Sequence, residues 1–337
     1  MGIRSLLVNI LVFIAATLGA LLLAEGISRV AMPQWAPEHA ERAFWAYDSL
    51  LGWSQRPNQD TRFVHRDFSV RITTNADGLR DRDHSVARVP GRRRLLVLGD
   101  SFAWGFGVER EQMFSKVIEA RHPDWEVINA GVSGYGTDQE YLYLKERGAR
   151  YRPDVVLLLF VPNDIEDNSR ADRYWHRKPL FVVSGDSLRL TDVPVPRPSF
   201  RDRLKNALYG DTYFFAHAYV AATVALRSLT HADQPTGPWR GTLQYAVTQR
   251  LLFALDREAR AIGARLVLVS VPTRDRNLEG LLAATADSVG VPYLPLDSAF
   301  AAIGERAHFA HDGHWNAAGH QVAAAAIESL LVARRIF

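Results

Sequence analysis

The chain has 337 residues, with 40 Lys and Arg against 37 Asp and Glu, a net charge of only +3, and no cysteine. So small a basic excess gives no indication of nucleic-acid binding, and the lack of cysteine excludes disulfides and thiolate metal sites. After an apolar N-terminal segment, the remaining length is sufficient for one sizeable α/β domain with insertions.

The N-terminal segment is apolar from Leu6 to Ala24, interrupted only by Asn9 and Thr17. This length matches a membrane span of about 20 residues and exceeds the ~7–15 apolar residues of a signal peptide. The best cleavage site, Leu22-Leu23-Ala24, lacks a small residue at its first position. We therefore expect an uncleaved transmembrane helix within residues 1–30; a cleaved signal peptide and a buried helix are the alternatives.

The orientation signal of this anchor is modest, because Arg4 precedes the apolar run and Arg29 follows it. With the N-terminus and Arg4 inside, the rest of the chain lies outside the cytoplasm, in the periplasm or the extracellular space.

Residues 31–93 have a different pattern, with short strands predicted within Tyr47–Trp53 and Phe63–Thr74. We expect a small β-rich segment packed on the main sheet and joined to it by a linker over Val86–Arg94. Three aromatic residues in this segment indicate either core packing or a sugar-binding platform: Trp45, Trp53 and Phe63.

A buried parallel strand is predicted at Leu95–Leu98, and Gly99-Asp100 ends it, so Ser101 lies at the carboxyl end of a strand. Ligands bind at that edge of open α/β sheets, and an amphipathic stretch over Val108–Arg121 follows. Taken alone, Ser101 is more readily interpreted as a helix N-cap.

Two further predicted strands end at polar or glycine-rich turns. The strand Trp125–Ala130 runs into a turn over Gly131–Gly136, where Gly134 is a candidate backbone donor to an oxyanion. The continuous apolar run Asp154–Val161 predicts a strand covered on both faces, and Asn163 follows it at the same sheet edge as Ser101.

An irregular insertion is predicted at about 165–238, with a hairpin around Phe181–Leu190 and an apolar stretch over Ala207–Leu229. Polar residues within that stretch argue against a second membrane span and favour a packed or membrane-surface helix. We expect the insertion to shape the acyl or alcohol pocket.

The remaining pattern is regular: helices at Arg240–Ile262, Leu278–Val289 and Gln321–Ala333, and strands at Ala264–Val271 and Val291–Leu296. Five parallel strands alternating with helices predict a three-layer α/β/α sandwich. Before the last helix, His311-Asp312-Gly313-His314 brings imidazoles and a carboxylate together.

In this order the blocks resemble the SGNH (GDSL-like) hydrolase family, membrane-anchored bacterial type, over residues 94–337. The resemblance implies a flavodoxin-like strand order, Ser101 as nucleophile and His314, followed by Trp315-Asn316, as base. It also implies an oxyanion hole formed by the Ser101 N–H, Gly134 and Asn163.

Two positions depart from the family pattern. Pro162 stands where the family usually has glycine, which removes an N–H without affecting the Asn163 side chain. The family usually has aspartate three residues before its histidine, but His311 occupies that position and Asp312 lies two before. We assign the orienting carboxylate to Asp312, and we regard His311 and His320 as structural.

The same chemistry follows from general principles, because a serine hydroxyl needs an oriented imidazole and donors for the oxyanion. A GxSxG elbow, an HExxH motif and a phosphate-binding loop are missing from the sequence, and neither a cofactor nor a metal is predicted.

We expect a serine esterase acting on O-acyl groups of envelope or exported glycans, with a glycan ester as substrate and polysaccharide-export proteins as possible partners. An O-acetyltransferase of exopolysaccharide and a catalytically inactive glycan-binding or scaffold relative are the alternatives.

Overall fold

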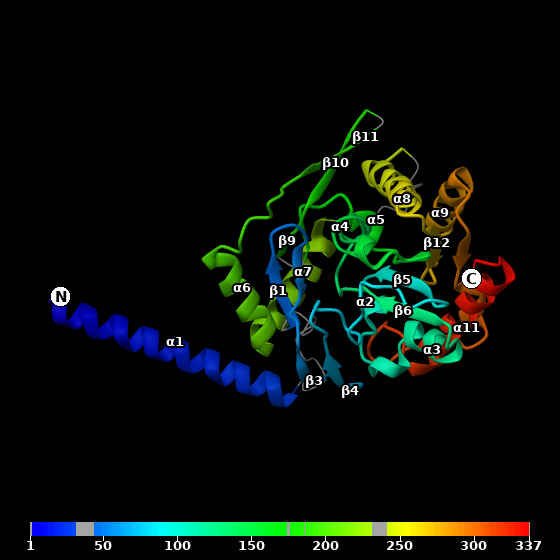
Figure 1. Cartoon of the computed structure of the whole chain (residues 1–337). Coiled ribbons are helices and arrows are strands. Elements are labelled where there is room, and N and C mark those ends of the chain that lie inside the picture. Colours follow the sequence, from blue (N-terminus) through cyan, green and yellow to red (C-terminus); the bar gives the residue numbers. More distant parts are fainter. Residues whose placement is uncertain (1, 32–43, 174–175, 186, 231–240, 337) are drawn as a thin grey trace. The chain divides into compact units, whose positions relative to one another are not determined.

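The computed structural model of the protein describes residues 2–31, 44–173, 176–185, 187–230 and 241–336 (Figure 1). The chain divides into two compact units: Met1–Ala43 with Ser199–Thr236, and Phe44–Pro198 with Gly237–Phe337. The predicted helix start at Arg240 and one residue of the predicted hairpin, Asp186, lie outside the described residues. The domain boundaries predicted at residues 30 and 93 stay a prediction.

The larger unit is built on a five-stranded sheet in the order β13-β12-β7-β5-β6. Every neighbouring pair is parallel, which confirms the predicted parallel sheet and gives the flavodoxin-like order. The strands are β5 (Arg93–Gly99), β6 (Trp125–Asn129), β7 (Val155–Phe160), β12 (Arg265–Ser270) and β13 (Tyr293–Pro295).

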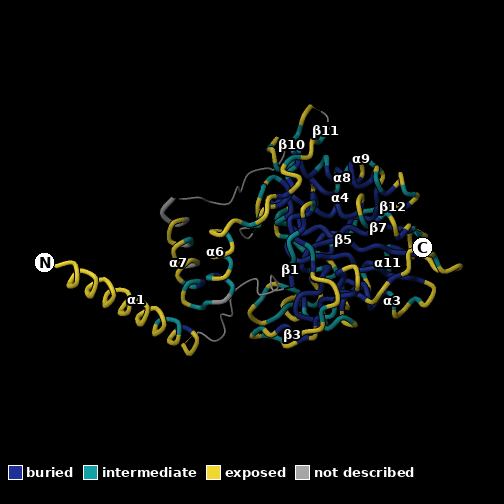
Figure 2. The backbone as a smooth tube through the Cα atoms, turned by 60° about the vertical axis from the view of Figure 1, so that its left-hand side comes forward, coloured by how far each residue is buried: buried dark blue, intermediate teal, exposed yellow. Residues whose placement is uncertain are grey.

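Helices cover both faces of this sheet, as the continuous apolar strands require. Alternate residues of β5 enter two separate cores: Leu96 and Leu98 pack on one face, Leu95 and Val97 on the other. One face is covered by α4 (Thr137–Glu146), α8 (Leu243–Ala261) and α9 (Arg276–Val289), the other by α3 (Phe114–Arg121), α10 (Asp297–Ala301) and α11 (Ala317–Ala333). Figure 2 shows the strands as the buried centre of this unit, which confirms the three-layer sandwich.

The chain after Ser101 is less helical than its pattern predicts. Helix α2 (Ser101–Trp104) ends at Gly105, which has φ of 81°, and α3 begins only at Phe114. The fully buried guanidinium of Arg80 donates to the carbonyls of Trp104, Gly105 and Val108. These carbonyls are therefore held by a side chain rather than by a helix, and the helix predicted from Val108 starts late.

The segment before the sheet forms two antiparallel hairpins, β1 (Trp45–Asp48) with β2 (Gly52–Gln55), and β3 (Asp60–Val64) with β4 (Ser69–Thr73). They do not pair with the main sheet. Instead, Trp53 Nε1 donates to the Ser133 carbonyl and Gln55 Nε2 to the Gly131 carbonyl, both at 3.2 Å. Trp45, Leu51 and Trp53 also belong to the hydrophobic core on one face of the sheet, in agreement with the expected packing on the main sheet. The aromatic residues Trp45, Trp53 and Phe63 are buried, as core residues are.

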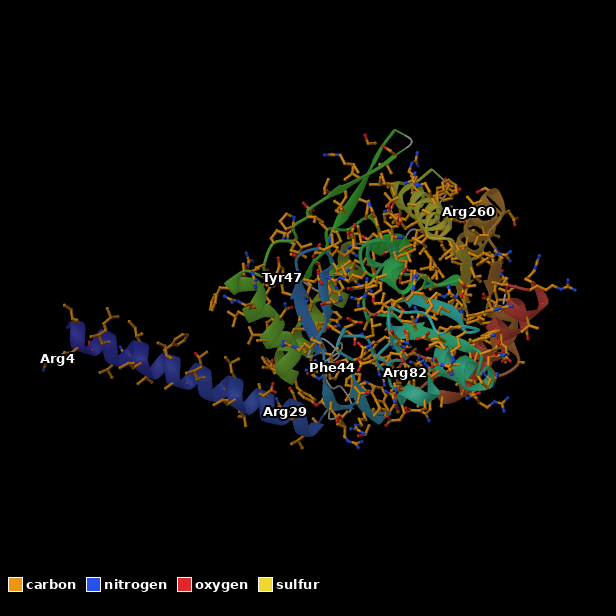
Figure 3. The ribbon with its side chains drawn as sticks, viewed as in Figure 1. Arg4, Arg29, Phe44, Tyr47, Arg82 and Arg260 are labelled. Carbon is orange, nitrogen blue, oxygen red and sulfur yellow. The ribbon has the colours of Figure 1, made fainter. Side chains whose placement is uncertain are left out.

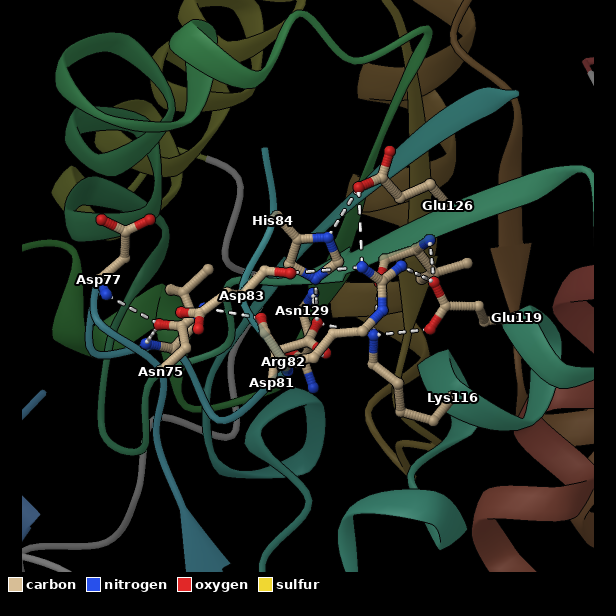
Figure 4. Close-up of polar contacts among 12 residues, drawn as sticks. Asn75, Asp77, Asp81, Arg82, Asp83, His84, Lys116, Glu119, Glu126 and Asn129 are labelled. Carbon is tan, nitrogen blue, oxygen red and sulfur yellow. Dashed lines mark hydrogen bonds and ion pairs between the residues drawn. The ribbon is translucent and has the colours of Figure 1, made fainter. Parts of the chain in front are cut away.

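A buried polar network joins the following loop to the sheet (Figure 4). Asp81 lies 2.6 Å from Lys116 Nζ and 3.0 Å from His84 Nε2, and His84 Nδ1 lies 2.9 Å from Glu126. Burial acts to raise the pKa of Asp81, but Lys116 and His84 outweigh it and bring the pKa down to about 2. The loop is thereby fixed to α3 and β6.

The predicted insertion contributes to both units. Residues 165–198 belong to the larger one and contain the hairpin β10 (Leu180–Ser184) and β11 (Ser187–Thr191), which confirms the predicted hairpin. The apolar stretch over Ala207–Leu229 belongs to the smaller unit, where it is split between two helices rather than forming one.

The smaller unit contains three helices: α1 (Ile3–Ala31), α6 (Phe200–Asp211) and α7 (Tyr213–Thr230). Among the described residues, only α1 is long and apolar enough to cross a membrane, and its apolar side chains are exposed. Figure 3 marks Arg4 and Arg29 toward its two ends. The Glu25 carboxylate accepts hydrogen bonds from the backbone N–H groups of Tyr213 and Phe214, so α7 begins beside the C-terminal end of α1.

Candidate active site

Ser101 lies where β5 ends, as the first residue of α2. The Asp100 carboxylate accepts a hydrogen bond from the Phe102 N–H at 2.9 Å and so caps this short helix. The Ser101 Oγ lies 2.7 Å from His314 Nε2 and 3.2 Å from Asp100 Oδ2. Because the hydroxyl has a single proton, the shorter contact favours the imidazole as its acceptor.

His314 is held on a loop that leads into α11. An antiparallel bridge between His308 and Trp315 closes the base of the loop. Asn316 caps α11 with its Oδ1 and donates its Nδ2 to the carbonyls of Arg306 and His308. The imidazole therefore projects toward Ser101 from a loop whose ends are both fixed.

Asp312 reaches the imidazole in spite of its shortened spacing. Its Oδ1 accepts a hydrogen bond from the His314 backbone N–H at 2.7 Å, the arrangement of an Asx turn, and lies 2.5 Å from His314 Nδ1. Burial acts to raise the pKa of Asp312, but the hydrogen bonds from His314 prevail and lower it. The turn thus allows an aspartate two residues before the histidine to reach the imidazole, where the family pattern has it three residues before.

Two phenylalanine rings enclose the imidazole. The Phe106 ring stacks on His314 with centroids 4.1 Å apart and planes at 22°, and the Phe102 ring lies at 4.9 Å. These contacts restrict the tilt of the imidazole and leave its Nε2 edge facing Ser101.

Gly134 and Asn163 come from the loops after β6 and β7, next to β5 in the sheet. Gly134 has φ of 79° in a turn closed by a hydrogen bond from the Tyr135 N–H to the Val132 carbonyl. Close packing also requires glycine at position 131, because a Cβ there would lie 2.6 Å from the backbone nitrogen of Trp104.

The Asn163 side chain is oriented by a residue that sequence reasoning missed. Its Nδ2 donates to Asp167 Oδ2 at 2.9 Å, and the fully buried Asp167 is paired with Arg173 at 2.5 Å. A carboxylate only accepts, so it selects the amide nitrogen; the second N–H of that nitrogen remains available for an oxyanion. Asp167 and Arg173 are six positions apart in the sequence, and no local pattern predicts that they pair.

Buried carboxyl groups surround this site as well. Burial raises the pKa of Asp100, and it raises the pKa values of Glu140 and Asp164 well above their usual range, with mutual repulsion adding to the effect. Among the described residues, neither carboxyl oxygen of Glu140 has a hydrogen-bond partner. Burial thus favours the uncharged form of both Glu140 and Asp164.

The other two histidines of this region lie apart from the serine. His311 Nδ1 lies 2.6 Å from Asp67. His320 accepts a hydrogen bond from the Phe114 N–H, and burial lowers its pKa to about 3. Within the described ranges, no group of histidine, aspartate and glutamate side chains could hold a metal ion.

Comparison with known proteins gives the class of this molecule. Residues 97–322, more than half of the chain, match the GDSL-like Lipase/Acylhydrolase family. The chain therefore belongs to this family of ester hydrolases, and the resemblance stated from the sequence is confirmed. A search of curated proteins finds no matching relative.

Solved structures are similar to this chain at low sequence identity. The "Crystal Structure of TesA" is 16% identical, with 73% of this chain and 100% of that chain covered and a TM-score of 0.43. The esterase EstA from Pseudoalteromonas sp. is 14% identical, with 72% and 98% covered and a TM-score of 0.44. The acetyl xylan esterase AlAXEase is 13% identical, with 70% and 98% covered and a TM-score of 0.41.

Proposed function

We propose that the protein is a serine esterase that works outside the cytoplasm and removes O-acyl groups from envelope or exported glycans. The observation that supports the chemistry best is the chain of contacts from Ser101 Oγ to His314 Nε2, and from His314 Nδ1 to Asp312. Family membership supports ester hydrolysis.

In the proposed mechanism, Ser101 Oγ attacks the ester carbonyl carbon while His314 Nε2 takes the hydroxyl proton. The Ser101 N–H, the Gly134 N–H and the free N–H of Asn163 bind the oxyanion. The C–O bond to the alcohol then breaks, and His314 returns the proton to the leaving oxygen. Water attacks the acyl-enzyme with the same base, which releases the acid and regenerates Ser101.

The proposed location rests on α1, an exposed apolar helix whose length fits a membrane span. Glu25, just past the apolar run, caps α7, so the first turn of α7 would lie at the membrane surface. An enzyme held there meets acylated glycans and lipids more often than soluble metabolites, and this favours a glycan or lipid ester over a soluble one.

The chemistry is tested by Ser101→Ala. We expect this variant to lose hydrolysis of a short-chain aryl ester and all labelling by a fluorophosphonate probe, while its thermal unfolding stays that of the native chain. Variants of this kind can retain rates about 10³- to 10⁴-fold above water, so the assay must cover that range. Full activity in Ser101→Ala would contradict the mechanism, and no acetate release from any O-acetylated polysaccharide would contradict the glycan substrate.

A further inference from the structure

The turn of the β3–β4 hairpin contacts the loop that carries His314. Asp67 in this turn accepts a hydrogen bond from the His311 backbone N–H at 3.0 Å and lies 2.6 Å from His311 Nδ1. The Asp67 side chain is 7% exposed and that of His311 42%. The carboxylate is therefore shielded by the loop that it binds.

His311 lies in the middle of this loop, and its side chain is partly exposed. The bridge between His308 and Trp315 closes the base. Asp312 and His314 lie between that bridge and His311, so holding His311 limits how far both can shift. Such precision matters, because a displacement of about 1 Å at a reacting group can cost about 10²-fold in rate.

An aromatic contact supports the same arrangement. Phe68, next to Asp67, packs on Phe309 of the loop at 5.2 Å and on Phe106 at 5.4 Å. Phe106 in turn stacks on His314. The packing is close: a Cβ added at Gly107 would lie 2.6 Å from the Phe309 ring and 2.8 Å from Phe68.

We propose that Asp67 is a positioning residue for catalysis, which binds His311 and thereby holds the loop that presents His314 to Ser101. The inference rests on the proposed role of His314 as base. It gives His311 a role at the position where the family usually has aspartate. It also makes the hairpin, which precedes the family match at residues 97–322, a part of the catalytic apparatus.

The test is a double-mutant cycle in the full-length protein with Asp67→Ala and His311→Ala, measured on one aryl ester. We expect each single variant to lower kcat about tenfold with KM within about twofold, because the base is displaced and the binding surface is not. The double variant should also lose about tenfold rather than a hundredfold, since both changes remove the same contact.

Two further variants separate positioning from stability. His311→Asn keeps a donor near the place of Nδ1 and should retain kcat within about twofold to threefold. Asp60→Ala removes the exposed cross-strand ion pair with Arg71 from the same hairpin without touching the loop, so its kcat should equal that of the native chain. If Asp67→Ala does not fold, the comparison of His311→Ala with His311→Asn decides by the same criterion, because residue 311 is partly exposed.

The inference would be overturned if Asp67→Ala or His311→Ala kept the native kcat, or lost no more than Asp60→Ala does. It would also be overturned if the loss in the double variant were the product of the two single losses. Failure of the proposed function has a different signature. In that case Ser101→Ala would keep full activity, whatever the Asp67 variants do.

Discussion

At the scale of single residues, the site depends on which acceptor takes the one proton of Ser101. Asp100 Oδ2 lies 3.2 Å away, but Asp100 already accepts from the Phe102 N–H and serves as the cap of α2. His314 Nε2 is nearer at 2.7 Å and is fixed by Asp312 on its far side. The geometry thus separates a structural carboxylate from the proposed base.

The residues of the His314 loop should differ in their effect on kcat. We expect His314→Ala to be as severe as Ser101→Ala, Asp312→Asn to be intermediate, and His311→Ala to be mild. An amide in place of the orienting carboxylate costs about 10⁴-fold in the serine-protease template, and we expect a smaller loss here because the Phe106 and Phe102 rings also hold the imidazole. Steady-state kinetics on one ester checks this order. A severe His311→Ala variant beside a tolerated His314→Ala would make His311 the base.

Asp167 provides a second test at this scale. Asn163→Ala should lower kcat about 10²- to 10³-fold, as loss of an oxyanion donor does. Asp167→Asn offers its amide nitrogen as well as its oxygen to Asn163, so the Asn163 side chain loses its fixed orientation and kcat should fall by a smaller factor with KM little changed. Activity and thermal unfolding measured together check this. An Asp167→Asn variant that is fully active would show that Asn163 is oriented by other contacts.

At the scale of elements, buried charged side chains connect the loop before the sheet to α3 and β6. Asp81 connects Lys116 of α3 with His84 and accepts a hydrogen bond from the Asn129 N–H at the end of β6 (Figure 4). This network fixes the loop that follows the two hairpins to α3 and β6.

The network predicts how stability depends on pH. The folded pKa of Asp81, about 2, is below its unfolded value of about 3.9, so its stabilisation is complete above pH 4 and is lost as the pH falls toward 2. The shift corresponds to on the order of 2–3 kcal/mol. Denaturant unfolding between pH 7 and pH 2 should show a smaller acid-induced loss in Asp81→Asn than in the native chain. The same loss in both would contradict the assignment.

At the scale of the whole molecule, the exposed apolar surface of α1 predicts a membrane span, and Arg4 before it predicts a cytoplasmic N-terminus. A reporter fused after Phe337 should be active only if it is of the periplasmic or extracellular type. Deleting Met1 through Arg29 should release a soluble and still active protein, although this also removes Glu25, the cap of α7. Reporter assays and membrane fractionation check both outcomes. A cytoplasmic C-terminus would exclude the proposed orientation and the envelope substrate.

The sequence by itself determined the class of the fold and the candidate residues, because both depend on local patterns. Apolar runs such as Leu95–Leu98 and Asp154–Val161 predict parallel strands, and the carboxyl ends of such strands lie at one edge. Ser101, Gly134 and Asn163 could therefore be named from their places after strands. The sequence did not predict how α2 ends at Gly105, where the carbonyls are held by Arg80 from an earlier loop.

Only the tertiary structure decided which side chains support the site. The pairing of Asp67 with His311 joins residues 244 positions apart, and the contact between Arg80 and Gly105 joins two loops. Such contacts depend on where the folded sheet brings loops together, and no local sequence pattern identifies the partner of a charged residue in a hairpin turn. The Asx turn at Asp312 is the intermediate case: the residues were visible in the sequence, but the hydrogen bonds that make the short spacing work required the folded loop.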